Sequence, residues 1–446
     1  MPPPRRNNSG QLVAVRNPIY AALTASAWKA REMVAQVSQR IDGGRLWQRL
    51  LDLAKFGATS KGGVCRLALS KEEVEARAAL VAWAKGIGLK PSVDAAANLF
   101  LALEGREAQL PPLLIGSHID SQPTGGKFDG AYGVLAGLEA VQAISEHAER
   151  PRRTIAVVAW MNEEGCRFAP GMMGSAVFTG KRTLADILPI KDRAGSTVEN
   201  ALAVVLDAER EIPRWPMGFP IAGFVEAHIE QGMTLQERGC TAGVVTGVQG
   251  KRTFRVDIIG EESHAGTTPR RARRDALTSA VAVVDALQKA MWDAADTVRF
   301  TIGMFEVSPN APSVVPGKVH FSIDLRHDDA DVIDRLGNMV PSVCEAARGR
   351  CEAVVRELLY DTPLEFPEAM RSRIERAAER LRIPHLRLQS PAGHDARYLH
   401  YVCPTGMIFI PCKDGISHNE AESITPADAT AGARILAETA FELANQ

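Results

Sequence analysis

A short apolar run that ends in metal-binding residue types is the feature that most constrains this chain. Residues 112–115 read Pro-Leu-Leu-Ile, which predicts a buried strand, and Gly-Ser-His-Ile-Asp follows directly at 116–120. Asp129 and Gly130 come nine residues after Asp120. Because α/β proteins bind ligands at the carboxyl ends of their strands, we expect an α/β fold with a polar site at this edge of the sheet.

The segments around this strand predict one unit of such a sheet. Residues 113–116 and 154–160 are continuous apolar runs, and both are expected to be buried strands. Between them, residues 133–147 carry apolar side chains at a helical spacing. Upstream, Ser26 to Gly88 is expected to be mostly helical, and Ser70 to Glu73 (Ser-Lys-Glu-Glu) predicts a capping box. Strand, helix and strand in this order indicate a crossover connection.

The pattern changes near Gly250. Apolar and polar residues alternate in 254–258, 300–304 and 319–325, and helical stretches are expected at 273–290 and 329–347. This order is typical of a small α+β sandwich, and buried-strand character returns at 405–410. We therefore expect an N-terminal extension and helix over 1–45, a first domain in two parts over 46–249 and 362–446, and an inserted α+β domain over 250–361.

Composition excludes some classes of function. The chain has 446 residues and a formal net charge of −1, which argues against a nucleic-acid or membrane-surface role driven by charge. No apolar run reaches the ~18 residues of a membrane span. Seven cysteines without any Cys-x-x-Cys pair favour reduced thiols and a cytoplasmic protein.

The first 31 residues are basic. They contain Arg5, Arg6, Arg16, Lys29 and Arg31 but no acidic residue. This composition resembles a transit peptide, and it equally suits a disordered arm or a helix on the surface. No apolar signal-peptide core is present, so secretion is not expected.

Imidazoles and carboxylates from separate motifs predict a metal centre. A mixed shell of nitrogen and oxygen ligands suits Zn²⁺, Mn²⁺, Co²⁺ or Ni²⁺, and five ligands with one shared carboxylate can hold two ions roughly 3.5–4 Å apart. Glu163 is the expected general base, and Asp120 is expected to fix the ring of His118. The candidate ligands are His118, Asp129, Glu164, His228 and His418.

Each of these motifs alone is a weak signal. An isolated His-x-Asp is usually accidental, and Glu163-Glu164 is more often a solvated helix start than a catalytic pair. His228, in Glu-Ala-His-Ile-Glu, could be a buried, hydrogen-bonded histidine. The order and local context of the motifs together favour a metal-dependent hydrolase.

The motifs resemble those of the M20 metallopeptidase family, most clearly from about Gly62 to the C-terminus. The form Glu-Ala-His-Ile-Glu-Gln-Gly at 226–232 is similar to the amidase branch, which holds N-carbamoyl-L-amino-acid hydrolases, allantoate amidohydrolases and β-ureidopropionases. The other matching motifs are His-Ile-Asp at 118–120, Phe-Asp-Gly at 128–130, Asn-Glu-Glu-Gly at 162–165, Ser-His-Ala-Gly at 263–266, Gly-His-Asp at 393–395 and Ser-His-Asn-Glu at 417–420.

The resemblance implies a mixed-sheet catalytic domain, an inserted lid and dimerisation domain, and a homodimer with two divalent ions per subunit. Asp129 would bridge the ions, with His118 and His228 on one and Glu164 and His418 on the other. His264 would reach the partner subunit's site and stabilise the oxyanion. Arg326 would grip a substrate carboxylate, while Gln231, Gly393 and His394 would line the pocket.

Two positions depart from the family pattern. The lid loop usually reads Asn-Val-Val-Pro, but Ser313 replaces the asparagine, and the nearby Asn310 could supply the missing amide. Arg270 replaces a methionine within a basic run. Both changes concern substrate choice and leave the metal ligands in place.

The expected function is hydrolysis of a linear amide or ureido bond in an N-carbamoyl or related N-substituted L-amino acid. An N-acyl-amino-acid hydrolase or dipeptidase with the same machinery is the enzymatic alternative. A metal-loaded binding protein without catalysis is a further one. A small molecule is the expected partner, with neither nucleic acid nor membrane involved.

Overall fold

The computed structural model describes residues 5–6, 12–13, 37–146 and 149–446. These divide into two compact units. The first comprises the chain up to Val244 with Pro367–Arg387 and His394–Gln446, and the second comprises Val245–Phe366 with Leu388–Gly393. Three predicted features lie outside the described residues: the helix expected before residue 37, most of the basic arm, and the end of a helix at residue 147. Within the arm, β1 (Arg5–Arg6) pairs with β2 (Leu12–Val13).

The first unit is built on a mixed sheet. Its strands follow the order β18 (Thr405–Ile410), β7 (Gly223–Ile229), β5 (Leu113–His118), β6 (Ile155–Trp160), β4 (Leu99–Leu103) and β3 (Lys90–Val93). The first four strands run parallel to one another. β4 runs antiparallel to β6, and β3 runs antiparallel to β4. Every residue of β5, β6, β7 and β18 is buried, so the predicted buried strands at 113–116, 154–160 and 405–410 are confirmed.

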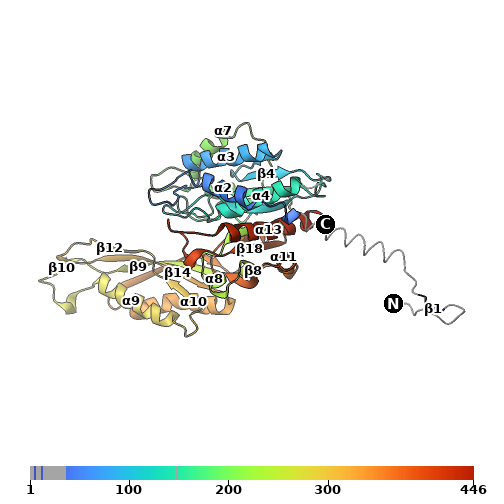
Figure 1. The fold of residues 1–446 in the computed structure, drawn as a ribbon. Helices are drawn as coiled ribbons and strands as arrows, with labels where there is room; N and C mark the ends of the chain where they lie inside the picture. The colour runs from blue at the N-terminus through green and yellow to red at the C-terminus, as the bar shows by residue number, and fades with distance from the viewer. Residues whose placement is uncertain (1–4, 7–11, 14–36, 147–148) are drawn as a thin grey trace. The chain divides into compact units, whose positions relative to one another are not determined.

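Helices cover this sheet and complete its core. The predicted crossover helix is α4 (Ala131–Ser145), which is buried along nearly its whole length and packs on β5, α13 (Pro426–Ala444) and α2 (Gly43–Leu53) (Figure 1). α11 (Glu368–Arg380) packs on α13 and β18. The C-terminal segment therefore completes the unit begun before residue 245.

The predicted capping box is only half formed. Ser70 caps α3 (Lys71–Gly86), and its hydroxyl accepts the backbone N–H of Glu73 at 3.3 Å. The Glu73 carboxylate, however, accepts the N–H of Leu69 and not that of Ser70. This carboxylate is buried, so it turns into the protein and away from the cap.

The second unit is an antiparallel sheet with both helices on one face (Figure 1). The strand order is β11 (Arg299–Thr301), β14 (Lys318–His327), β9 (Gly250–Ile259) and β15 (Glu352–Asp361), and β12 (Phe305–Ser308) also pairs with β14. Apolar side chains of α9 (Ala276–Met291) and α10 (Ala330–Ala347) form one core with those of β9 and β14. The predicted helices at 273–290 and 329–347 are therefore confirmed with small shifts of their ends.

The strand predicted at 300–304 is divided into two. Thr301 pairs with Asp324 and Phe305 with Phe321, so four steps along one strand match three along β14. The extra residue makes a bulge, where Met304 N–H donates to the Ser322 hydroxyl at 3.0 Å. The bulge keeps the chain in the sheet but shifts the alternation by one residue: Ile302 and Met304 are half-buried, Phe305 and Glu306 are both exposed, and Val307 is half-buried again.

The second unit is wider than the predicted 250–361. It comprises Val245–Phe366 with Leu388–Gly393. β16 (Leu364–Glu365) pairs with β8 (Ala242–Val248), and both strands belong to the same nine-stranded sheet as β18. The remaining elements are α5 (Met173–Phe178), α6 (Leu184–Ile187), α7 (Val198–Ala208), α8 (Thr234–Arg238), β10 (Ser263–His264), η1 (Arg270–Ala272), β13 (Val314–Val315), β17 (His385–Ser390), α12 (Ala396–Leu399) and η2 (Lys413–Gly415). Among the described residues, no helix has both the length and the apolarity to cross a membrane.

Candidate metal centre

Two histidines at the ends of adjacent parallel strands face one carboxylate. His118 ends β5, and its Nδ1 donates to the backbone carbonyl of Asp120 at 3.0 Å. His228 lies near the end of β7, and its Nδ1 donates to the carbonyl of Ile229 at 2.9 Å. Both rings therefore turn Nε2 toward Asp129, at 3.7 Å from His118 and 3.2 Å from His228.

Asp129 belongs to two clusters of possible metal ligands. One is His118, Asp129 and His228, and the other is Asp129, Glu164 and His418. Oδ1 of Asp129 faces the first pair of histidines, while Oδ2 lies 3.3 Å from Nε2 of His418. Burial would raise the pKa of Asp129, but hydrogen bonds from His228 and His418 outweigh it and hold that pKa well below its usual value.

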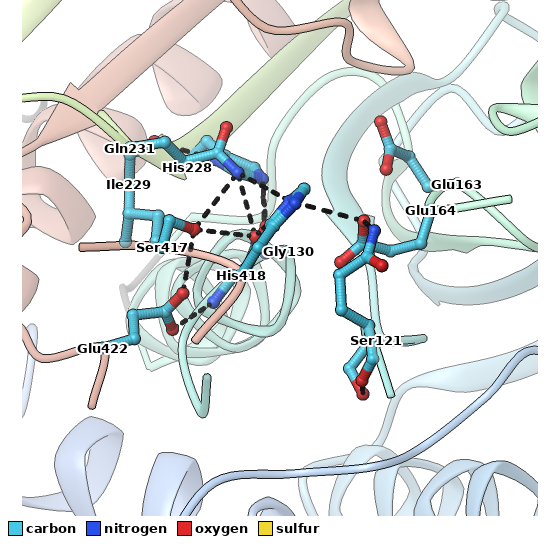
Figure 2. Close-up of polar contacts among 12 residues, drawn as sticks. Ser121, Gly130, Glu163, Glu164, His228, Ile229, Gln231, Ser417, His418 and Glu422 are labelled. Carbon is cyan, nitrogen blue, oxygen red and sulfur yellow. Dashed lines mark hydrogen bonds and ion pairs between the residues drawn. The ribbon is translucent and has the colours of Figure 1, made fainter. Parts of the chain in front are cut away.

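A glycine lets the Asp129 loop approach the first histidine. Gly130 has φ of +62°, and a Cβ at this position would lie 2.3 Å from Nε2 of His118. Both the backbone conformation and the lack of space therefore require glycine here. Its N–H also lies 3.2 Å from Nε2 of His228 (Figure 2).

Asp120 contacts both the ring of His118, as the sequence predicts, and the Glu163–Glu164 segment. Its carboxylate accepts the backbone N–H groups of Glu163 at 3.1 Å and Glu164 at 3.2 Å. The ring of His118 is held by the Asp120 carbonyl, since the carboxylate is farther away at 3.5 Å. The carboxylate is thus committed to the loop that carries the two glutamates.

The two glutamates differ in their contacts. Oε2 of Glu164 lies 3.5 Å from Nε2 of His418 and accepts the side-chain amide of Gln122 at 2.6 Å. Glu163 is in neither ligand cluster, and its Oε2 lies 3.6 Å from Nε2 of His118. Burial raises the pKa of Glu163 well above its usual value and that of Glu164 to about 7.

His418 reaches the centre from the loop after β18, and Glu422 supports that loop. Glu422 accepts the N–H groups of Phe128 at 2.9 Å and Asp129 at 3.1 Å. It also accepts the Ser417 hydroxyl at 3.0 Å (Figure 2). It therefore ties together two segments that are far apart in sequence. Burial raises the pKa of Glu422 to about 7, and the hydrogen bond to Asp129 raises that of His418 to about 8.

Sequence reasoning missed three supporting residues: Gln122, Ser417 and Glu422. Each acts by a hydrogen bond to a partner distant in sequence, which no local pattern reveals. The Ser417 hydroxyl lies 3.1 Å from Oδ2 of Asp129, and Gln231 donates to the same oxygen at 2.9 Å. Gln231, predicted to line the pocket, is thereby placed beside the second cluster.

His394 is buried next to His228, with ring centroids 4.5 Å apart. Burial lowers its pKa well below the usual value, and the neighbouring His228 adds to this effect. Behind these rings, Glu226 accepts the Ser117 hydroxyl at 2.7 Å and the N–H of Ala396 at 2.9 Å. Together, Glu226, His228 and His394 form a third group of possible metal ligands, which shares His228 with the first cluster.

The other predicted residues belong to the second unit. Arg326 donates two hydrogen bonds to Asp324 and one to the Pro391 carbonyl, and His264 is exposed at the end of β10. Ser313 and Asn310 are exposed, and the Ser313 carbonyl accepts the N–H of Ala265 at 3.0 Å. Gly393 ends the short segment of this unit at 388–393.

The first unit's residues fit divalent cations. Nε2 of His118 is a buried atom that has no hydrogen-bond partner in the described part of the chain, and it points into a cluster of carboxylates. Imidazole nitrogen and carboxylate oxygen are the donors that zinc, manganese, cobalt and nickel share. Cations would also relieve the repulsion among buried carboxylates, of which Glu163 and Glu164 have raised pKa values.

Known proteins are similar to this chain in sequence and in fold. The model of the family described as "Peptidase family M20/M25/M40" matches residues 114–442. N-carbamoyl-L-amino acid amidohydrolase of Geobacillus stearothermophilus is 37% identical over 91% of this chain and 99% of that protein. Allantoate amidohydrolase of Bacillus subtilis is 32% identical over 88% of this chain and 95% of that protein.

One solved structure is also similar to this chain over most of its length. The crystal structure of a hydantoinase/carbamoylase family amidase from Burkholderia vietnamiensis matches with a TM-score of 0.84 and 42% identity, over 91% of this chain and 98% of that one. The matches span nearly the whole chain, and the family model covers all the predicted ligands. The chain therefore belongs to peptidase family M20/M25/M40 and, within it, to the amidase branch.

Proposed function

We propose that this chain is a binuclear-metal amidohydrolase that acts on an N-carbamoyl-L-amino acid. Hydrolysis of C–N amide bonds follows from membership in the amidase branch. The observation that carries the binuclear proposal is that Asp129 belongs to two clusters of possible ligands. One cluster adds two histidines to Asp129, and the other adds a glutamate and a histidine. The names of the relatives support the N-carbamoyl substrate.

The proposed ligands follow the two clusters. His118 and His228 would hold one ion, Glu164 and His418 the other, and Asp129 would bridge both. Bound divalent cations lower the pKa of a water molecule to about 7 and polarise the substrate carbonyl. Their ligand preferences overlap, so zinc, manganese, cobalt and nickel all remain candidates.

Glu163 is the proposed general base. It lies beside His118 but outside both ligand clusters, so its carboxylate is available to take a proton from water. Hydrogen bonds from the backbone of Glu163 and Glu164 to Asp120 fix the segment that presents it. The same carboxyl group would then return the proton to the leaving nitrogen.

The proposed substrate contacts are those that the family resemblance implies. Arg326 would bind the substrate carboxylate, and His264 would donate a hydrogen bond to the oxyanion. Gln231, His394, Gly393, Asn310 and Ser313 would line the pocket. Hydrolysis of an N-carbamoyl substrate with water would release the free amino acid, ammonia and carbon dioxide.

One observation favours a second substrate class. Ser313 offers a hydroxyl where the family's lid loop usually has an asparagine, which leaves more room and fewer fixed hydrogen bonds. Larger N-acyl-amino acids, or dipeptides, are therefore the alternative substrates of the same site. Allantoate is named for a relative and is a further small candidate.

We also propose a homodimer and a cytoplasmic location. The role implied for His264 supports the homodimer, since this residue would serve the partner subunit's site. The seven cysteines support the location, because all of them are free thiols. The inserted domain proposed over 250–361 would act as lid and dimerisation domain.

A substrate panel tests the proposal. The metal-depleted enzyme is supplied with Mn²⁺, Zn²⁺, Co²⁺ or Ni²⁺ and assayed on N-carbamoyl-L-amino acids, allantoate, N-acyl-L-amino acids and dipeptides. We expect metal-dependent release of amino acid and ammonia, with N-carbamoyl substrates giving the highest kcat/KM. Preference for N-acyl substrates or dipeptides would select the alternative, and absence of turnover on every substrate would refute the proposed function.

A further inference from the structure

The ring of His264 is oriented by the turn that follows it. Its Nδ1 accepts the backbone N–H of Gly266 at 3.0 Å and that of Thr267 at 3.1 Å. A nitrogen that accepts hydrogen bonds needs its lone pair, so the ring proton in this arrangement lies on Nε2. The exposed Nε2–H is therefore left to donate.

The turn itself is held at both ends. On one side, His264 pairs with Val314 in the short ladder of β10 and β13, and Ala265 N–H donates to the Ser313 carbonyl. On the other side, the half-buried Arg273 donates from Nε to the Thr268 carbonyl at 2.9 Å and from Nη2 to the Ala265 carbonyl at 2.5 Å. One guanidinium thus spans the turn from residue 265 to residue 268.

We propose that Arg273 is a positioning residue that fixes His264 as a neutral hydrogen-bond donor through Nε2. This inference rests on the proposed function, in which His264 donates to the oxyanion. By bonding the carbonyls of Ala265 and Thr268, Arg273 keeps the intervening N–H groups of Gly266 and Thr267 directed at Nδ1. Arg271, two residues earlier, is exposed and serves as the control.

Tight packing supports the same orientation. A Cβ placed on Gly266 would lie 3.2 Å from Cε1 of His264, so the turn fits closely against the ring. If the turn opened, Nδ1 would lose its two donors and the ring could rotate or take the other tautomer. The donor would then be misplaced at the moment when charge develops on the substrate.

The test measures the protonation and hydrogen bonding of the His264 ring together with the catalytic rate. Solid-state ¹⁵N NMR of the sedimented, metal-loaded enzyme labelled in histidine is recorded at a pH of about 8.5, where an ordinary histidine is neutral. The His264 signals are assigned by their loss in His264→Gln. We expect a protonated Nε2 and a hydrogen-bonded Nδ1 in the wild type and in the matched control Arg271→Gln.

In Arg273→Gln we expect the hydrogen-bond shift of Nδ1 to be lost. kcat on the preferred substrate should fall by about tenfold to a hundredfold, with KM nearly unchanged, because the donor acts mainly in the transition state. Arg273→Lys, which can still donate to one carbonyl, should partly restore both signals and should fold if the glutamine variant does not.

Two results would overturn the proposal. One is a proton on Nδ1 of His264 in the wild type. The other is an unchanged Nδ1 signal and kcat in Arg273→Gln. The NMR result stands even if no substrate in the panel is turned over, so failure of this inference and failure of the proposed function can be told apart.

Discussion

At the scale of single residues, the guanidinium of Arg326 is already oriented by its own unit. Nε and Nη2 donate to the two oxygens of Asp324 at 2.8 and 3.2 Å, and Nη1 donates to the Pro391 carbonyl at 3.0 Å. One N–H on each of Nη1 and Nη2 remains for a further acceptor. Asp324 thereby directs the free side of the group that would bind a substrate carboxylate.

Asp324→Asn should weaken binding of carboxylate substrates. Asparagine cannot offer two charged acceptors, so the guanidinium would be less firmly held, and we expect KM to rise by about tenfold. The measurement is KM for the preferred substrate and for its amide analogue, which lacks the carboxylate. The amide analogue should show little change. Glu306→Gln, an exposed substitution in the same sheet, is the control, and an unchanged KM for the carboxylate substrate would count against this role.

The candidate ligands could be found from the sequence because their chemistry is recognisable in short motifs. His118, Asp129, Glu164, His228 and His418 all lie in the two clusters that share Asp129. Their supports were not predictable in the same way. The carboxylate of Asp120 holds the loop of Glu163, whereas the backbone carbonyl of Asp120 holds the ring of His118. A sequence motif does not show whether a residue accepts through its side chain or through its backbone.

At the scale of elements, the first turn of α3 buries a carboxylate. Burial raises the pKa of Glu73 from 4.5 to about 7, against an opposing effect of Arg77 and with a further increase from Asp120. The folded chain therefore holds a proton that the unfolded chain has released between these two pH values. Its stability should fall as pH rises through this window.

Glu73→Gln should remove this pH-dependent loss. The glutamine carbonyl can still accept the Leu69 N–H, and it carries no charge to bury. We expect the Tm of the variant relative to wild type to be a few degrees higher at pH 8 than at pH 5. This shift corresponds to at most about 3 kcal/mol in the free energy of unfolding. Thermal unfolding at both pH values measures it.

Contributions of the other ionisable groups cancel in that difference because both proteins contain them. Glu75→Gln, an exposed change on the same helix, is the control and should show no such pH dependence. A Tm difference that is equal at the two pH values would contradict the buried charge at Glu73.

Elements with a clear period were predictable, and irregular ones were not. Continuous apolar runs identified β5, β6 and β18, and helical spacing identified α4, α9 and α10. β15 is partly exposed over most of its length and lacks a regular alternation of burial, so its sequence gave no signal. The bulge between β11 and β12 depends on pairing with β14, which a single segment cannot specify.

At the scale of the whole molecule, the change in pattern near Gly250 revealed the second unit, but its bounds depend on contacts between distant segments. Residues 245–249, 362–366 and 388–393 also belong to this unit, although nothing in their local sequence distinguishes them. At the same scale, the proposed homodimer would combine the ligand clusters of one chain with His264 of the other.

Subunit exchange tests that assembly. Glu163→Gln and His264→Ala should each be inactive alone, but mixing them should restore activity. A heterodimer would contain one site with an intact Glu163 and a His264 from its neighbour. Mass spectrometry of the intact dimers verifies exchange. If exchanged heterodimers stay inactive, His264 acts within its own chain or not at all.

In the proposed metal-dependent hydrolase, Glu163 moves the proton without binding metal. The most direct measurement is the metal content and turnover of Glu163→Gln, with His418→Ala as the matched loss of a ligand. We expect Glu163→Gln to keep the wild-type content of two ions per chain while kcat falls by about 10²- to 10⁴-fold, and His418→Ala to lose metal. Near-wild-type turnover of Glu163→Gln, or loss of its metal, would contradict the account.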